Sequence, residues 1–177
     1  MPPGNEIRIA EAYRQYTPPF DVSVVVRRLL SSVPEEYLRG LDCVVLTNVE
    51  ALSRKERKGK GWTRGRKFSN SRVLAFYHHR SRTSMAYIEV RVDKVIEGTG
   101  KWAPRIAFLR DIVVGHVLFH EIGHHIHSTV RPEHREKEDV ADAWSGKLLR
   151  SFVRKTYWYC IPAIRVCLWM KRKGWFS

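Results

Sequence analysis

One run of residues, 108–128, constrains the fold of this chain more than any other feature. It reads FLRDIVVGHVLFHEIGHHIHS, and its first half, DIVVGHVLF, is apolar and typical of a buried helix. Pro132 ends the element that precedes it, because proline interrupts a helix. Five of the chain's eight histidines fall in this run, at positions 116, 120, 124, 125 and 127. We therefore expect a long helix that carries a cluster of imidazoles.

The histidines differ in the direction they take from this helix. At about 100° per residue, four of them share one face: His116, His120, His124 and His127. His125 lies on the other side, so we expect it at the surface or against a partner. We expect His116 to be a half-buried helix residue and His127 to complement the helix dipole near the helix end. Two further histidines, His78 and His79, are expected at the surface of a strand.

His120, Glu121 and His124 form an H-E-x-x-H pattern. Two imidazoles at positions i and i+4 stand one helical turn apart and can reach a single metal ion about 2.0–2.1 Å from each nitrogen. The intervening glutamate lies at about 100° from the first histidine, where it can take a proton from a metal-bound water. The pattern therefore predicts a metal site with Glu121 as its general base.

Catalytic zinc normally has a third protein ligand. The downstream candidates are Glu133, His134, Glu136, Glu138, Asp139 and Asp142. If a second helix starts near Glu133 and runs antiparallel to the first, the residue about 6–8 Å into it lies level with His124. Glu138 fits this position best, and Glu136 remains an alternative. Asp142 shares the face of Glu138 and can accept the second N–H of a metal-bound imidazole. The other interpretation is that Glu138 and Asp142 form a solvated acidic face.

His120-Glu121-Ile122-Gly123-His124 followed by Glu138-x-x-Ala141-Asp142 resembles the zincin metallopeptidases of the gluzincin kind, including their thermolysin-like arrangement. The segment is also similar to the ImmA/IrrE-like minimal peptidases. This resemblance covers about residues 41–150. It implies Zn²⁺ held by His120, His124 and Glu138, a minimal gluzincin fold, and the hydrolysis of peptide bonds in a protein or peptide substrate. It also implies a substrate strand paired along a sheet edge, for which the strand SMAYIEVRV is our candidate.

The remaining patterns predict an α+β protein. We expect a small, mostly antiparallel sheet of three or slightly more strands, packed on the histidine helix and on a second ligand-bearing helix. The expected helices cover 20–40, broken at Pro34, and 133–154. The expected strands are 41–48, 72–80 and 84–95, and the expected loops are 51–71 and 97–104. We divide the single domain into an N-terminal helical segment (1–40), a catalytic core (41–154) and an aromatic, basic tail packed on the core (155–177).

The net charge of +14 favours an anionic partner such as nucleic acid, anionic lipid or an acidic protein. The segment RKERKGKGWTRGRK (54–67) is a candidate for phosphate contact and base stacking. Its candidate contact residues are Lys55, Arg57, Lys58, Lys60, Trp62, Arg64, Arg66 and Lys67. A solvated loop is the alternative interpretation.

Three cysteines, an odd number without a C-x-x-C pair, indicate a reducing compartment, and the N-terminus lacks the apolar core of a signal peptide. We therefore expect a cytoplasmic protein without a transmembrane segment. The candidates for a donor to the oxyanion are Tyr77, His134, Tyr157 and Tyr159. Two alternatives to a peptidase stay open: a zinc-containing regulatory or nucleic-acid-binding protein on the same fold, and a basic membrane-surface protein whose zinc is structural.

Overall fold

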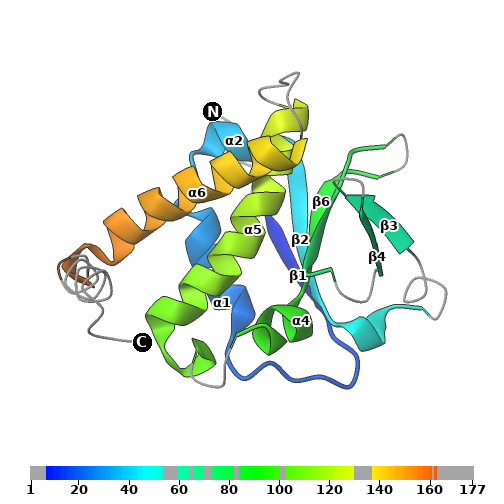
Figure 1. Ribbon diagram of the computed structural model, residues 1–177, viewed down its shortest axis with the longest axis horizontal. Helices are drawn as coiled ribbons and strands as arrows, with labels where there is room; N and C mark the ends of the chain where they lie inside the picture. Colours follow the sequence, from blue (N-terminus) through cyan, green and yellow to red (C-terminus); the bar gives the residue numbers. More distant parts are fainter. Residues whose placement is uncertain are drawn as a thin grey trace.

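A four-stranded mixed sheet and the helices beside it form the body of the protein in a computed structural model (Figure 1). The structure describes residues 7–53, 60–63, 66–69, 73–81, 84–99, 103–129, 137–160 and 162, with only the backbone at 60–63, 66–69 and 103. The strands of this sheet are β1 (Arg8–Ala12), β2 (Leu41–Thr47), β5 (Ala75–His78) and β6 (Ala86–Arg91). The protein is therefore α+β, as expected.

The sheet has the strand order β1-β2-β6-β5, in which β1–β2 and β2–β6 are parallel and β5–β6 is antiparallel. Four strands fall within the expected three or slightly more, but the expectation of a mostly antiparallel sheet was wrong, because β2 pairs in parallel with both β1 and β6. The side-chain amide of Asn48 extends the pairing of β1 and β2, since it accepts from the backbone N–H of Arg14 and donates to its carbonyl, both at 2.9 Å. The strand order places β5 at the edge of the sheet, and it places β6, the expected edge strand, in the interior.

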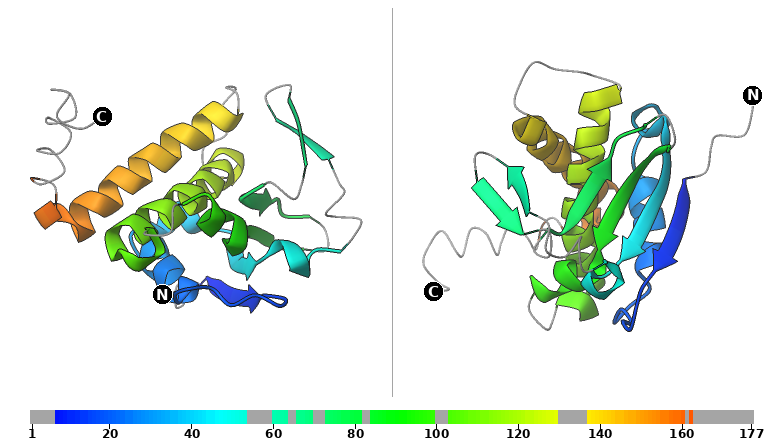
Figure 2. Two further views of the ribbon diagram at one scale, coloured as in Figure 1. Left: turned by 60° about the horizontal axis from the view of Figure 1, so that its bottom comes forward. Right: turned by 90° about the vertical axis from the view of Figure 1, so that its right-hand side faces the viewer.

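Two further predictions need correction. The predicted strand 84–95 ends at Arg91, and the chain continues as helix α4 (Val92–Glu97). The predicted loop 51–71 contains a short 3-10 helix (Val49–Ala51) at its start and a two-stranded antiparallel hairpin, β3 (Lys60–Thr63) and β4 (Arg66–Ser69). Figure 2 shows this hairpin as a unit separate from the four-stranded sheet.

The helices follow the sequence pattern closely. Helix α1 (Val22–Leu30) begins at Asp21, whose carboxylate accepts from the backbone N–H of Val24 at 3.0 Å. Pro34 precedes the short helix α2 (Glu35–Leu38). Two long helices follow, α5 (Ala107–Thr129) and α6 (Lys137–Thr156), with 3-10 turns at Ala103–Arg105 and Trp158–Cys160. Among the described helices none has the length and apolar character needed to cross a bilayer.

The core lies where α5 meets the sheet, α1 and α6. Its fully buried residues include Val26, Leu29, Val44, Leu46, Ile88, Leu118, Phe119, Ile122 and Ile126. A buried polar contact lies near the start of α5. The Asp111 carboxylate is fully buried and accepts from Arg28 at 2.6 Å and from the Tyr157 hydroxyl at 2.7 Å. These bonds join α1, the start of α5 and the segment after α6.

Candidate metal centre

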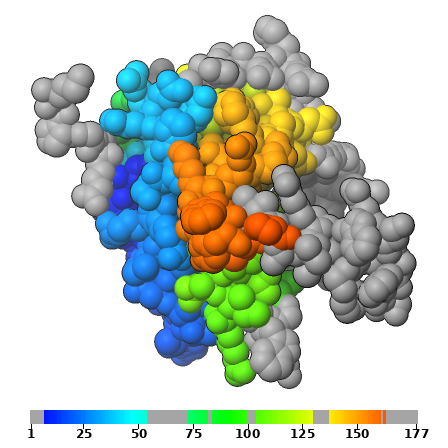
Figure 3. All heavy atoms as spheres, turned by 90° about the vertical axis from the view of Figure 1, so that its left-hand side faces the viewer, coloured from blue at the N-terminus to red at the C-terminus, as the bar shows by residue number. Residues whose placement is uncertain are grey.

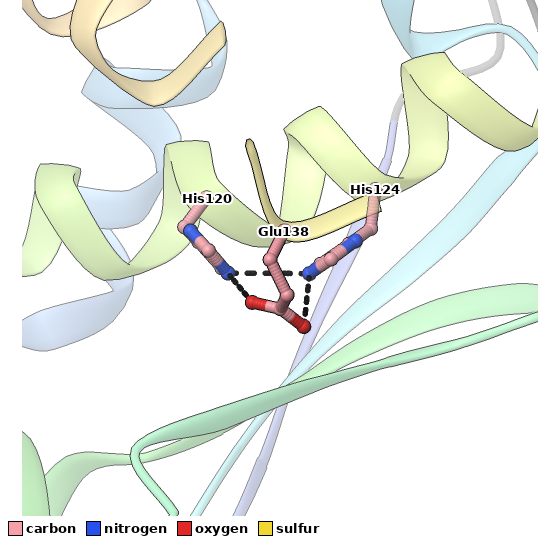
Figure 4. Close-up of side chains that lie close together, drawn as sticks. All are labelled: His120, His124 and Glu138. Atoms are coloured by element: carbon pink, nitrogen blue, oxygen red, sulfur yellow. Dashed lines mark hydrogen bonds and ion pairs between the residues drawn. The ribbon is translucent and has the colours of Figure 1, made fainter. Parts of the chain in front are cut away.

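Three of the predicted ligands meet between α5 and α6 (Figure 4). The Nε2 atoms of His120 and His124 lie 3.2 Å apart. The Glu138 carboxylate faces both, with Oε2 3.5 Å from His120 Nε2 and Oε1 3.8 Å from His124 Nε2. One donor atom from each residue lies within 4.8 Å of the other two, so the three could hold a single ion. Glu136, the alternative ligand, lies outside the described residues.

Gly123 brings the two helices to the spacing that this group requires. A Cβ atom at this position would meet the backbone of Ala141 on α6, at distances that real Cβ atoms do not show. Ser145 adds a second tie, since its hydroxyl donates to the carbonyl oxygen of His116 at 3.0 Å. Residues earlier in α5 therefore face residues later in α6. The helices run in opposite directions, as the choice of Glu138 assumed.

Asp142 lies behind His120, on the side away from the convergence point. Its Oδ1 is 3.0 Å from Nδ1 of His120. A carboxylate in this position accepts the Nδ1 hydrogen and holds the imidazole in the tautomer whose Nε2 lone pair is available to a metal. The structure therefore brings Asp142 to the position predicted for it.

Glu121 is buried, with 8% of its surface exposed. Burial raises the pKa of its carboxyl to about 7, the backbone N–H of Tyr77 on β5 opposes this by donating to the carboxylate, and the charge of Glu138 adds to the increase. A carboxyl with this pKa can accept and release a proton near neutral pH. Glu121 thus has the electrostatic setting of a general base.

The environment of His124 favours the neutral imidazole. Burial, assisted by the charges of the neighbouring His120 and His127, lowers its pKa to about 4. Neutral imidazole is the form that binds a metal ion. The donor set is therefore two imidazole nitrogens and one carboxylate, with one imidazole already oriented by Asp142, and this chemistry fits a zinc ion.

An open cleft of about 540 Å³ leads to these groups. One wall is the edge strand β5 with the residues before it, and the other is formed by α5 and the start of α6. His79 and Lys137 stand at one end of the cleft, and Leu74 stands at the other. Sequence reasoning placed His79 at the surface. It is exposed, and it lines the cleft.

The expectation for His125 was wrong. This side chain is fully buried, with Nε2 3.0 Å from the carbonyl oxygen of Arg39 and Nδ1 3.0 Å from the Tyr77 hydroxyl. Because a carbonyl only accepts, Nε2 carries the hydrogen. Burial lowers the pKa of His125, so the ring is neutral and the Tyr77 hydroxyl donates to Nδ1. His125 therefore joins α5 to β5 and to the turn after α2.

The remaining histidines and the candidate donors to the oxyanion lie in different places. His116 is exposed, against the expectation of half-burial, and His127 is buried at 7% exposed. Tyr157 donates to Asp111, far along α5 from the ligands, and Tyr159 is 60% exposed on the turn beside it. Neither lines the cleft. The hydroxyl of Tyr77 is engaged by His125, and His134 lies outside the described residues.

The basic segment 54–67 is described only in part. The side chains of all eight predicted nucleic-acid contacts lie outside the described residues: Lys55, Arg57, Lys58, Lys60, Trp62, Arg64, Arg66 and Lys67. The described backbone shows that β3 and β4 form a hairpin within this segment, on either side of residues 64 and 65. Contact with nucleic acid stays a prediction.

Comparison of the chain with known protein families, with curated proteins and with solved structures finds no match. The functional proposal for this chain therefore depends on its own residues and their geometry.

Proposed function

We propose that this protein is a zinc-dependent endopeptidase on a minimal gluzincin-like fold. One observation carries the proposal: three metal donors converge beside a buried carboxylate whose pKa is raised to about 7, and all four groups line one open cleft. Two imidazoles and one carboxylate are a ligand set that catalytic zinc takes, whereas calcium and magnesium prefer oxygen ligands alone.

His120, His124 and Glu138 would hold the zinc, and Asp142 would orient His120. When bound, zinc supplies Lewis-acid chemistry, since it lowers the pKa of a coordinated water to roughly 7 and polarises a carbonyl group. Glu121 then accepts a proton from the attacking water and delivers it to the leaving amine. Its bond from the Tyr77 N–H fixes the carboxylate against β5 while it does so.

The edge strand β5 supports an extended peptide as the substrate. Residues of an antiparallel strand direct their backbone groups alternately toward and away from the partner strand. Because the N–H of Tyr77 reaches Glu121, outside the sheet, the backbone groups of Ala75 also point away from β6. Ala75 lines the cleft, so a substrate strand can pair there, next to the proposed zinc site.

An apolar pocket of about 290 Å³ adjoins the cleft at Leu74 and extends along α5 past His116 and Val117. A substrate strand antiparallel to β5 would run from the His79 end of the cleft toward Leu74. The pocket would then take a side chain on the C-terminal side of the scissile bond. Sequencing of cleavage products should therefore find leucine, isoleucine or phenylalanine enriched within two residues after the cut.

Glu121→Gln tests the proposal, because glutamine keeps the size of the side chain and cannot act as a base. We expect zinc content and folding close to those of the unaltered protein, and peptide cleavage lower by about 10²-fold or more. His120→Ala is the matched variant that removes the metal, and it should lose both zinc and cleavage. The proposal fails if Glu121→Gln keeps every activity that His120→Ala loses. That result would assign the site to a zinc-containing regulatory protein without proteolysis.

A further inference from the structure

The C-terminal half of α6 and the turn after it form an exposed basic and aromatic surface at a distance from the metal centre. Its cations are Lys147, Arg150, Arg154 and Lys155, and all four are exposed. At about 100° per residue, the first three of them fall within about 60° of one another on the helix. Trp158 and Tyr159 follow on the adjoining 3-10 turn. We call these six residues the basic–aromatic surface.

The two aromatic side chains of this surface are unusually exposed. Trp158 is 69% exposed and Tyr159 60% exposed, the largest values among the big apolar side chains of the described residues. Their neighbour Tyr157 is buried and bonded to Asp111, and its backbone N–H donates to the carbonyl oxygen of Val153 at 2.8 Å. The turn is therefore anchored by one aromatic residue while it presents the next two to the outside.

From Lys147 onward the charged residues of the sequence have a single sign. In the sequence no aspartate or glutamate follows Asp142, whereas eight basic residues do: Lys147, Arg150, Arg154, Lys155, Arg165, Lys171, Arg172 and Lys173. The two acidic residues of the metal centre on α6 lie at its other end, where Glu138 is about 24 Å from Arg154 along the helix axis. Figure 3 shows the C-terminal half of α6 and the following turn, in orange, at the surface of the molecule. An anionic partner can reach the surface without approaching the carboxylates.

We propose that the basic–aromatic surface binds the face of an anionic phospholipid bilayer. Tryptophan and tyrosine are enriched at the boundary between headgroups and acyl chains, because one end of each ring is apolar and the other is polar. Lysine and arginine lay their apolar stems beside such rings and keep their charges among the headgroups. The stretch TYWYCIPAI, which begins at the last residue of α6, carries no charge, and a segment of this composition suits a bilayer boundary better than a phosphate backbone in water.

Sedimentation with lipid vesicles tests this proposal on the full chain. The vesicles contain either phosphatidylcholine alone or phosphatidylcholine with 30% phosphatidylserine. We expect binding to the anionic vesicles, weakened by salt. A variant with Lys147, Arg150, Arg154 and Lys155 all changed to Gln should bind about 10²–10³-fold less tightly, since each cation near an anionic surface adds about a factor of five. Trp158→Ala combined with Tyr159→Ala should lower binding about tenfold.

A matched control removes four exposed cations elsewhere, by changing Arg8, Arg14, Arg39 and Arg80 to Gln. It carries the same net charge as the surface variant and should keep most of the binding. Equal loss in the two variants would overturn the proposal, because binding would then depend on net charge alone. Absence of binding at low salt, or equal binding to neutral vesicles, would also overturn it. The proposal would also be overturned if the protein bound a DNA or RNA oligonucleotide but not vesicles, and the surface variant lost that binding.

Quenching of tryptophan fluorescence by brominated lipid gives an independent reading. Trp158→Phe removes one indole and keeps an apolar ring in its place. We expect the unaltered protein to show a quenched component on anionic vesicles that this variant lacks. If the quenching is identical in both proteins, Trp158 does not enter the bilayer and the proposed surface is wrong.

Discussion

A Cβ atom on Gly123 would lie 2.7 Å from the Cα atom of Ala141 and 2.8 Å from its carbonyl oxygen. The obstacle is backbone, which cannot rotate away as the end of a side chain can. Glu138 stands one turn before Ala141, and Asp142 directly follows it. The closeness of α5 and α6 at this point therefore sets the distance from both carboxylates to His120 and His124.

Gly123→Ala should separate the helices and weaken the metal site. We expect a loss of about 1–3 kcal/mol in the free energy of unfolding and a clear fall in zinc affinity. Gly115→Ala is the matched control on the same helix, because its Cβ would meet side-chain atoms and no backbone, with Leu29 and Leu149 nearest, at 3.1 and 3.3 Å. Urea unfolding and zinc titration measure the two effects. Equal stability of the two variants would show that the helices can shift at no cost.

Asp142→Asn should lower zinc affinity by about 10–100-fold, because the amide is a weaker acceptor for the Nδ1 hydrogen of His120. Asp139→Asn removes the same charge three residues earlier, at an exposed position, and should leave the affinity nearly unchanged. Competition with a chelator of known affinity measures both. If the two variants lose affinity alike, Asp142 acts only through its charge and does not orient His120.

In the metal-free protein, Glu121 should make stability depend on pH. Its pKa rises from 4.5 in the unfolded chain to about 7 in the folded protein, so the folded protein binds the extra proton between these values. The stability that this proton gives is complete below pH 4.5 and is lost as pH rises through 7. Glu121→Gln should therefore match the unaltered protein near pH 4.5 and exceed its stability at pH 8, by on the order of 3 kcal/mol.

The lowered pKa of His124 has the opposite effect, since its contribution is lost as pH falls below 6.5. It acts in both proteins and cancels in the difference between them. Urea unfolding at a series of pH values gives that difference, with Glu36→Gln as an exposed control. A difference that stays constant with pH would show that burial does not hold the proton on Glu121.

Tyr77→Phe should destabilise the fold without removing the metal site. It leaves Nδ1 of the fully buried His125 without its donor, at a cost of about 1–3 kcal/mol. Tyr159→Phe, at an exposed hydroxyl, should cost little. A different outcome would change the role of Tyr77: cleavage reduced about 10²-fold, with stability unaltered, would make its hydroxyl the donor to the oxyanion.

Local sequence patterns were enough to predict part of the fold. Pro34 marks the start of α2, and apolar runs mark β2 and α5. β1 was missed because RIAEA is short and mostly exposed, and its partner β2 lies more than thirty residues away. The boundary after Arg91 was missed because Val92 and Val95 are β-branched and continue the apolar pattern of the strand. In the structure the same two side chains are buried from a helix.

The metal group was predictable because its members lie at helical spacings on two neighbouring helices. The burial of His125 was not predictable. The helical period gives the direction of its side chain from α5, but it does not show which segments pack against that side of the helix. Its partners come from β5 and from Arg39, which are 48 and 86 residues away in the chain. The edge position of β5 likewise depends on which strands pair, and only the sheet order decides that.

The two parts of the candidate site also differ in how much of the chain must be assembled to form them. His120, His124 and Glu138 fall within one local helical pair, whose closure needs only a short segment of chain. The N–H that fixes Glu121 comes from Tyr77, on a strand that pairs with β6 within a sheet whose parallel contacts span more than thirty residues. Because contacts between distant segments form slowly, we expect the metal ligands to meet early in folding and the base to be fixed only when the sheet is complete.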